Sequence, residues 1–338
     1  MEKRRYRYYK IDYRTYNYTL KKYHNLHREI YAENARDAVK MLKSKECNRE
    51  FEIVKVYFVD IFGDRNDRFY PRTYVIDKED FERGEYMVYI TGDIHGDFNR
   101  FLELEKFCHK HNLGRNDWIV CLGDVGLNYY GKDDPREWSI KTIAADIPAN
   151  LFCIHGNHER RPSRKDGYKL RKICGDICGR VWYDPQYPNQ YFAIDGEVYQ
   201  ILSGIEMLNC LVCGGAYSVD KYYRLEWGYN WFPDEQPNEK IKKKVAQQVN
   251  DSNIDVVLSH TCPTRYVPTE LFLSCVDQST VDSSTEEFLD DILDILEETH
   301  IGKPFWYFGH FHGNKYTDDY VMLFDDIIKF GDKVNTDD

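Results

Sequence analysis

The feature that most constrains the fold is a unit repeated through the last three quarters of the chain, a short apolar run followed at once by a turn rich in Gly, Asp, Asn or His. Short runs of this kind, rich in Val, Ile and aromatic residues, are typical of buried strands. Helical periodicity occupies intervals between them, as at residues 98–108 and 288–296. Strands alternating with helices predict an α/β fold in which helices cover the sheets. The runs are residues 87–90, 118–122, 151–154, 210–213, 256–258 and 305–308.

The first 84 residues follow a different pattern. Residues 6–19 and 51–62 alternate as strands do, and apolar residues recur at helical spacing over 32–42. We predict a small N-terminal α/β (α+β) domain over residues 1–84, a polar linker at 63–67 and a larger domain over residues 85–338. The small domain carries no catalytic signature, so an accessory or interaction role is expected. Within the larger domain, Asp195-Gly196 predicts a hairpin turn between strands at 191–194 and 198–202.

The composition argues against several classes of partner. Lys and Arg number 46 against 57 Asp and Glu, and the resulting net charge of −11 disfavours a long nucleic acid. No apolar run approaches the roughly 18 residues of a membrane span, and the first residues lack the apolar segment of a signal peptide. We therefore expect a cytoplasmic protein without a membrane partner. The sequence does not predict the oligomeric state.

Side chains that can bind metal ions follow five of the six runs directly. A single histidine or Gly-Asp pair after a strand is more often structural than a ligand, so the inference depends on the joint pattern. If the central strands are parallel, their carboxyl ends meet at one edge, where α/β folds place their sites. Carboxylate and amide oxygens mixed with imidazoles suit Mn, Fe or Zn, and so many ligands suit two ions. The candidates are Asp93, His95, Asp124, His155, Asn157, His158, Glu159, His260, His310 and His312.

These blocks, in this order, resemble the calcineurin-like metallophosphoesterase superfamily from residue 87 to the C-terminus. The matching residues are Asp93-Ile94-His95, Gly123-Asp124, Gly156-Asn157-His158-Glu159, His260 and Gly309-His310-Phe311-His312. The resemblance implies a four-layer α/β/β/α metallophosphoesterase sandwich for residues 85–338. It also implies a dinuclear metal centre that hydrolyses phosphate esters with a metal-activated hydroxide.

The resemblance further implies individual roles. Asp93, His95 and His312 would hold one divalent transition-metal ion, Asn157, His260 and His310 would hold the second, and Asp124 would bridge the two. Manganese is the expected metal, with iron or zinc as alternatives. His158 matches the histidine that contacts the scissile phosphate and protonates the leaving oxygen, so it is the candidate catalytic residue. Glu159 is either a residue that orients its neighbours or an acid at a helix start.

The chain departs from the phosphoprotein phosphatase branch of that superfamily. That branch follows its Gly-Asp with a second Asp and an Arg, where this chain has residues 125–129, and it has Arg where this chain has His155. Positively charged side chains in place of those arginines would come from residues 214–224, which follow a predicted strand. Lys221 or Arg224 would pair with a substrate phosphate and Tyr217 would donate to it. The alternative is a surface loop with ordinary salt bridges.

These features together predict hydrolysis of phosphate mono- or diesters. The expected substrate is a phosphorylated small molecule, such as a small nucleotide, or a phosphoprotein. One alternative is a nuclease that acts on nucleic-acid ends or linkages. The other is a catalytically silent binding scaffold with the same fold. Loss of catalysis usually removes ligands or the acid, whereas all eight positions are filled here, which favours an enzyme.

Overall fold

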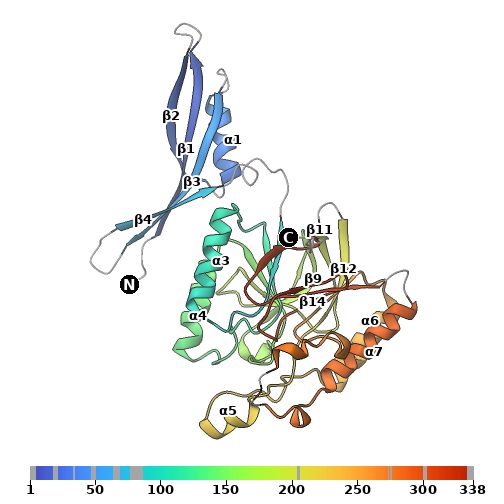
Figure 1. Cartoon of the computed structure of the whole chain (residues 1–338). Helices are drawn as coiled ribbons and strands as arrows, with labels where there is room; N and C mark the ends of the chain where they lie inside the picture. Colours follow the sequence, from blue (N-terminus) through green and yellow to red (C-terminus); the bar gives the residue numbers. More distant parts are fainter. Residues whose placement is uncertain are drawn as a thin grey trace. The chain divides into compact units, whose positions relative to one another are not determined.

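The computed structural model describes residues 5–17, 22–32, 35–46, 51–63, 69–76, 87–203, 206–272, 274, 276–299 and 303–332 (Figure 1). The chain divides into two compact units. One comprises residues 1–86 and 102–115, and the other comprises residues 87–101 and 116–338. Each unit has its own sheet and is described separately.

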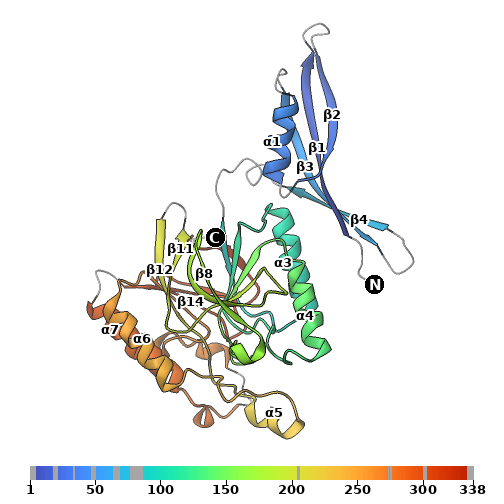
Figure 2. The same ribbon diagram turned by 180° about the vertical axis from the view of Figure 1, so that it is seen from behind.

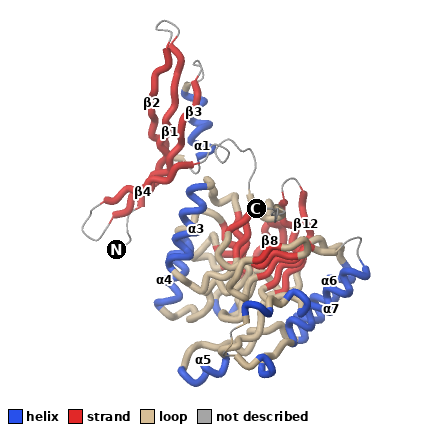
Figure 3. The backbone as a smooth tube through the Cα atoms, viewed as in Figure 1, coloured by secondary structure: helices blue, strands red, loops and turns tan. Residues whose placement is uncertain are grey.

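The N-terminal unit contains an antiparallel sheet in the order β2-β1-β3-β4 and one covering helix (Figure 3). Tyr9, Ile11 and Tyr13 of β1 point to the face on which α1 packs, and they share a buried cluster with its apolar residues Val39 and Leu42. Buried and less buried residues therefore alternate along β1, as they do in a sheet with one covered face. The elements are β1 (Arg5–Asn17), β2 (Lys22–Ile30), α1 (Ala35–Lys45), β3 (Phe51–Gly63) and β4 (Phe69–Ile76).

Two features of this unit differ from the sequence predictions. Strand β2 was not predicted, and β4 was not predicted either. Gly63 belongs to β3 and pairs with Phe69 of β4, so the polar segment predicted as a linker joins two neighbouring strands of one sheet. Residues 64–67 of that segment lie outside the described residues.

The second unit has one curled sheet made of two parallel halves. In the first half β5, β6 and β7 are parallel, with β10 added in parallel to β7 and β17 antiparallel to β5. In the second half β12, β13, β14 and β16 are parallel, flanked by the antiparallel strands β11 and β15. The central strands are β5 (Val88–Thr91), β6 (Trp118–Cys121), β7 (Asn150–Cys153), β12 (Glu206–Cys213), β13 (Val256–Ser259) and β14 (Phe305–Phe308). All six predicted runs are therefore strands.

Strand β9 (Ile177–Tyr183) joins the two halves, because it pairs with β10 near its end and with β11 near its start. The predicted hairpin at Asp195-Gly196 is wrong for this reason. Its flanking strands, β10 (Gln190–Phe192) and β11 (Val198–Ser203), belong to different halves and are not paired with each other. The remaining strands are β8 (Lys169–Ile173), β15 (Lys315–Tyr316), β16 (Tyr320–Met322) and β17 (Ile327–Lys329).

The two halves face each other across a core to which both contribute, including Ile90, Val120, Val212 and Leu258. On the outer face of the second half, α6 and α7 pack against β13 and β14 through a separate apolar cluster. Helix α4 lies on the opposite side, along the first half (Figures 1 and 2), and its Lys141 carbonyl accepts from Gln190 Nε2 of β10 at 2.7 Å. The α/β/β/α layering expected from the resemblance is thereby confirmed. The helices are α3 (Phe98–Lys110), α4 (Pro135–Ala145), α5 (Lys221–Trp227), α6 (Glu239–Asp251) and α7 (Ser284–Thr299).

No helix in the described part of the chain is both long enough and apolar enough to cross a membrane.

Candidate metal centre

The predicted ligands lie together beyond the carboxyl ends of five strands. Asp93 and His95 follow β5, Asp124 follows β6, and Asn157 follows β7. The second half contributes His260 from the end of β13 and the pair His310 and His312 from the turn after β14. The strands within each half are parallel, so their carboxyl ends reach the same edge, as the sequence pattern requires.

A first group of donors surrounds one buried carboxylate oxygen. Asp93 Oδ2 lies 3.6 Å from His95 Nε2 and 3.5 Å from His312 Nε2, and those two ring nitrogens are 3.0 Å apart. Within the described residues, Asp93 Oδ2 has no hydrogen-bond partner. A buried oxygen without a donor is costly, and a cation held by this oxygen and the two imidazoles would remove that cost.

A second group converges on the amide oxygen of Asn157. His260 Nε2 lies 2.8 Å and His310 Nδ1 3.1 Å from Asn157 Oδ1. Asn157 Nδ2 donates to Ser218 Oγ at 2.9 Å, which turns Oδ1 toward the histidines. This arrangement places two imidazole nitrogens and one amide oxygen at the corners of a second site suited to a transition metal.

The hydrogen bonds of His260 show that this second site suits a cation. His260 Nδ1 lies 2.7 Å from the carbonyl of Leu122, which can only accept, so Nδ1 carries a proton. In the neutral ring, Nε2 would then present a lone pair to the Asn157 oxygen, which is also an acceptor. Burial lowers the pKa of His260, but Asp124 and Asp93 outweigh it and raise the pKa to about 9. The two carboxylates therefore favour a positive charge at Nε2, which is the atom that would bind a metal ion.

Asp124 lies between the two groups. Its Oδ2 is 3.4 Å from His260 Nε2 and 4.0 Å from His95 Nδ1, while Oδ1 accepts from the backbone N–H of His158 at 2.8 Å. Burial raises the pKa of Asp124, but the surrounding histidines, His260 first, lower it well below the usual carboxylate range. Gly156 packs directly on this carboxylate, and a Cβ at position 156 would overlap its Oδ1. One ionised side chain thus faces donors of both groups.

Backbone strain is concentrated at these residues. A non-glycine residue in the left-handed region is uncommon and costs about 1–3 kcal/mol. Such residues persist where the surrounding structure fixes them, and here the His95 N–H donates to the Asp124 carbonyl at 2.6 Å. The strained turns therefore aim the ligand side chains at one point. The left-handed φ values are 54° for His95, 47° for Asp124, 69° for His310 and 52° for His312.

His158 and Glu159 have different surroundings. The His158 side chain faces the cavity beside Asp124, with Nε2 4.0 Å from Asp124 Oδ2, and burial lowers its pKa. Glu159 is buried and accepts from the backbone N–H groups of Gly126 and Gly156, both at 3.2 Å. Burial raises the pKa of Glu159 to about 8. No helix starts at Glu159, so its carboxyl group orients the two ligand-bearing turns.

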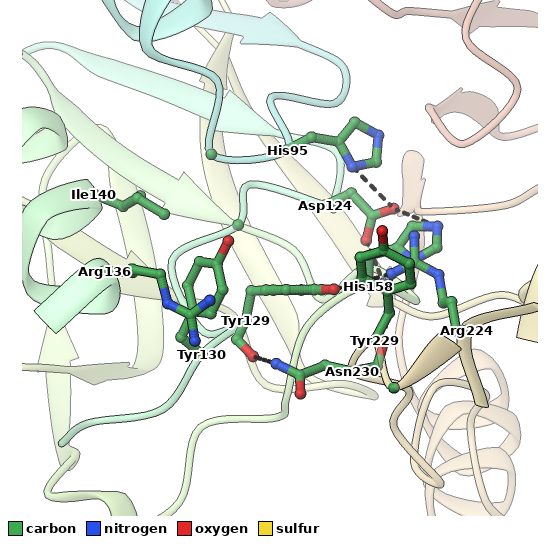
Figure 4. A pocket seen from close by; sticks show the side chains of 13 residues that line it. His95, Asp124, Tyr129, Tyr130, Arg136, Ile140, His158, Arg224, Tyr229 and Asn230 are labelled. Carbon is green, nitrogen blue, oxygen red and sulfur yellow. Dashed lines mark hydrogen bonds and ion pairs between the residues drawn. The ribbon is translucent and has the colours of Figure 1, made fainter. Parts of the chain in front are cut away.

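A cavity of about 440 Å³ opens beside these residues (Figure 4). Arg224 of α5 lines it, and its Nη1 donates to the Tyr129 hydroxyl at 3.2 Å, while Nε donates to Asp220 at 2.7 Å. Tyr217 and Lys221 do not line the cavity, and Lys221 Nζ instead lies 4.3 Å from the Trp231 ring centroid. A phosphate-binding role for these three residues stays a prediction. His155 is buried and is also not a lining residue.

Most of the cavity wall that lies across from the metal residues was not predicted from the sequence. This wall comes from the loop after Asp124, the first turns of α4 and the chain after α5. A pair of tyrosines so soon after a ligand residue was a usable signal, whereas the contribution of α4 had none. The missed lining residues are Tyr129, Tyr130, Arg136 and Ile140, and Tyr229 and Asn230 line the cavity as well.

Comparison with a family of known sequences agrees with this geometry. The sequence model of the family described as calcineurin-like phosphoesterase matches residues 86–314. A search of curated proteins gives no match. Among solved structures, a phosphopantetheinyl hydrolase from Mycobacterium tuberculosis is similar, with 14% identity and a TM-score of 0.38 over 71% of this chain and 88% of that one. The family match covers well over half of the chain, and the chain therefore belongs to the calcineurin-like phosphoesterases, a family of metal-dependent phosphoester hydrolases.

Proposed function

We propose that this chain is a dinuclear phosphoesterase that hydrolyses phosphate mono- or diesters, with a small nucleotide or a phosphoprotein as substrate. Residues 85–338 form the catalytic domain and residues 1–84 an accessory domain. One observation carries the proposal: donors from two strand-end groups approach the single buried carboxylate of Asp124. Two ions that share one bridging carboxylate are suited to clamping a phosphate during in-line displacement.

The donor set fits two transition-metal ions. One ion would be held by Asp93, His95 and His312. The other would be held by Asn157, His260 and His310. Asp124 would bind both ions. Hard oxygens mixed with imidazoles suit manganese, with iron or zinc as alternatives. When bound, the ions supply Lewis-acid charge and lower the pKa of water to make a nucleophile at neutral pH.

The residues of this chain would bind the phosphate and transfer the proton. The hydrogen bond from the His158 backbone N–H to Asp124 fixes the start of its side chain, and the ring faces the cavity, from which Nε2 would protonate the leaving oxygen. Within the described residues, Nη2 of Arg224 has no hydrogen-bond acceptor. That nitrogen would donate to a phosphate oxygen, taking the role of the arginines absent at residues 125–129 and 155.

Metal binding and turnover test this proposal together. The full chain, stripped with a chelator and titrated with Mn²⁺, is expected to bind two ions and to hydrolyse p-nitrophenyl phosphate or its bis-ester. The measurements are metal content and release of p-nitrophenolate, with phosphopeptides, dinucleotides and single-stranded DNA as further substrates. Two bound ions without turnover of any ester would indicate the binding scaffold. A strong preference for DNA would indicate the nuclease.

Arg224→Ala is expected to lower kcat/KM by about 10- to 150-fold, chiefly through KM, because a hydrogen bond to a charged group contributes about 1.5–3 kcal/mol. The melting temperature should stay unchanged, since none of the residues of α5 is buried. The measurement is steady-state kinetics on p-nitrophenyl phosphate. Arg164→Ala, at an exposed arginine outside the cavity, is the matched control. Unchanged kinetics in Arg224→Ala would remove this residue from the proposed site.

A further inference from the structure

The cavity beside the metal centre has a second end with different chemistry. Figure 4 shows Ile140, Arg136 and Tyr130 on one side of it, across from His158 and Arg224. Gly96 and Gly126 line the same cavity, and their backbones approach so closely that a Cβ on Gly126 would overlap the Gly96 nitrogen. Because neither carries a side chain, nothing from these two positions projects into the space between the two ends.

Contacts within the chain orient the side chains of this second end. The Arg136 guanidinium lies over the Tyr130 ring, with Cζ 4.0 Å from the ring centroid. Buried Glu137 of α4 accepts from the backbone N–H groups of Tyr130 at 2.9 Å and Gly131 at 3.3 Å, so it fixes the loop that carries the ring. Asp134 accepts from the Arg136 side chain at 3.1 and 2.7 Å, which fixes the guanidinium.

The charge balance differs between the two ends. The bidentate ion pair with Asp134 compensates the charge of Arg136, so this end offers planar and apolar surface without a free charge. Among the described residues that line this end, a second phosphate would find no cation without an ion-pair partner. An uncharged planar ring would find the outer face of this stacked tyrosine–guanidinium pair and the apolar side chain of Ile140.

We infer that Tyr130, Arg136 and Ile140 form an aromatic subsite that binds the base of a nucleoside phosphate ester. The inference deepens the proposed function, on which it rests for the position of the phosphate. A volume of about 440 Å³ is in the range of sites for whole small molecules, which leaves room for more than a phosphate. Bases stack on both tyrosine rings and arginine planes, and both are present. An extended phosphopeptide would leave this prebuilt surface unused.

Binding of two non-hydrolysable phosphonates tests the subsite. One is the analogue of adenosine 5′-monophosphate and the other the analogue of ribose 5-phosphate, so only the base differs. In calorimetry with the Mn²⁺-loaded full chain, we expect the adenosine analogue to bind about 5- to 140-fold more tightly, the factor given by one stacked base. Tyr130→Leu should remove this preference and Tyr130→Phe should keep it.

Arg136→Lys keeps the charge beside Asp134 and removes the planar face, so it should reduce the preference without threatening the fold. Equal binding of the two analogues to the wild-type chain, or a preference that survives in Tyr130→Leu, would overturn the subsite. Absence of binding by either analogue would also overturn it. A chain that fails to hydrolyse any ester but still shows the Tyr130-dependent preference would overturn the proposed function and leave the subsite standing.

Discussion

Asp124→Asn is expected to reduce turnover of p-nitrophenyl phosphate by at least about a thousandfold and to weaken both metal ions together. The carboxylate faces donors of both groups, and its negative charge would offset the repulsion between the two proposed cations. An amide keeps the size of the side chain but loses that charge, so several kcal/mol of electrostatic stabilisation of the transition state are lost. The measurements are initial rates over a Mn²⁺ titration and the number of ions bound at each concentration.

Asp318→Asn is the control for this experiment, because it makes the same chemical change at an exposed aspartate outside the site. The Asp124→Asn variant should retain the wild-type circular dichroism spectrum. If its activity recovers at saturating Mn²⁺, the bridging role is excluded. If one ion is lost while the other keeps its wild-type affinity, Asp124 serves a single site, and the dinuclear proposal needs another bridge.

The sequence predicted the strands that carry the ligands because two simple signals coincide there. Buried parallel strands such as β6 and β13 are short and mostly apolar, and a metal-capable residue follows each of them within three residues. Once such strands are parallel, their order in the sheet is not needed to place the ligands at one edge. The left-handed backbone of His95 was not predictable in the same way, since it follows from contacts with the turn at Asp124.

The sequence predictions failed where strands pair, or side chains pack, with partners that are distant in the sequence. Asp195-Gly196 has the residues of a hairpin turn. However, the strands that flank it, β10 and β11, are separated in the sheet by β9, which was not predicted. Strand β2 alternates poorly and most of its residues are exposed, so periodicity gave no signal there. The wall formed by Tyr130 and Arg136 depends on how α4 packs below the loop through Glu137, which residue types alone do not reveal.

His158→Asn is expected to lower kcat/KM by about 10²–10⁴-fold for phenyl phosphate and much less for p-nitrophenyl phosphate. Phenolate is a poor leaving group that needs a proton in the transition state, whereas p-nitrophenolate leaves readily without one. Burial lowers the pKa of His158, Asp124 raises it, and the positive charge of Arg224 adds to the lowering. The negative charge of a bound phosphate acts in the opposite direction and favours the protonated ring that the role requires.

The ratio of the two rates, with the metal content of the variant, separates the roles that His158 could have. A general acid gives a loss that depends on the leaving group while both ions stay bound. A metal ligand gives equal losses on both substrates together with lost metal. An arginine-like contact to the phosphate oxygens gives equal losses with both ions retained, mainly in KM. Only the first pattern supports His158 as the proton donor, because only proton transfer depends on the basicity of the departing oxygen.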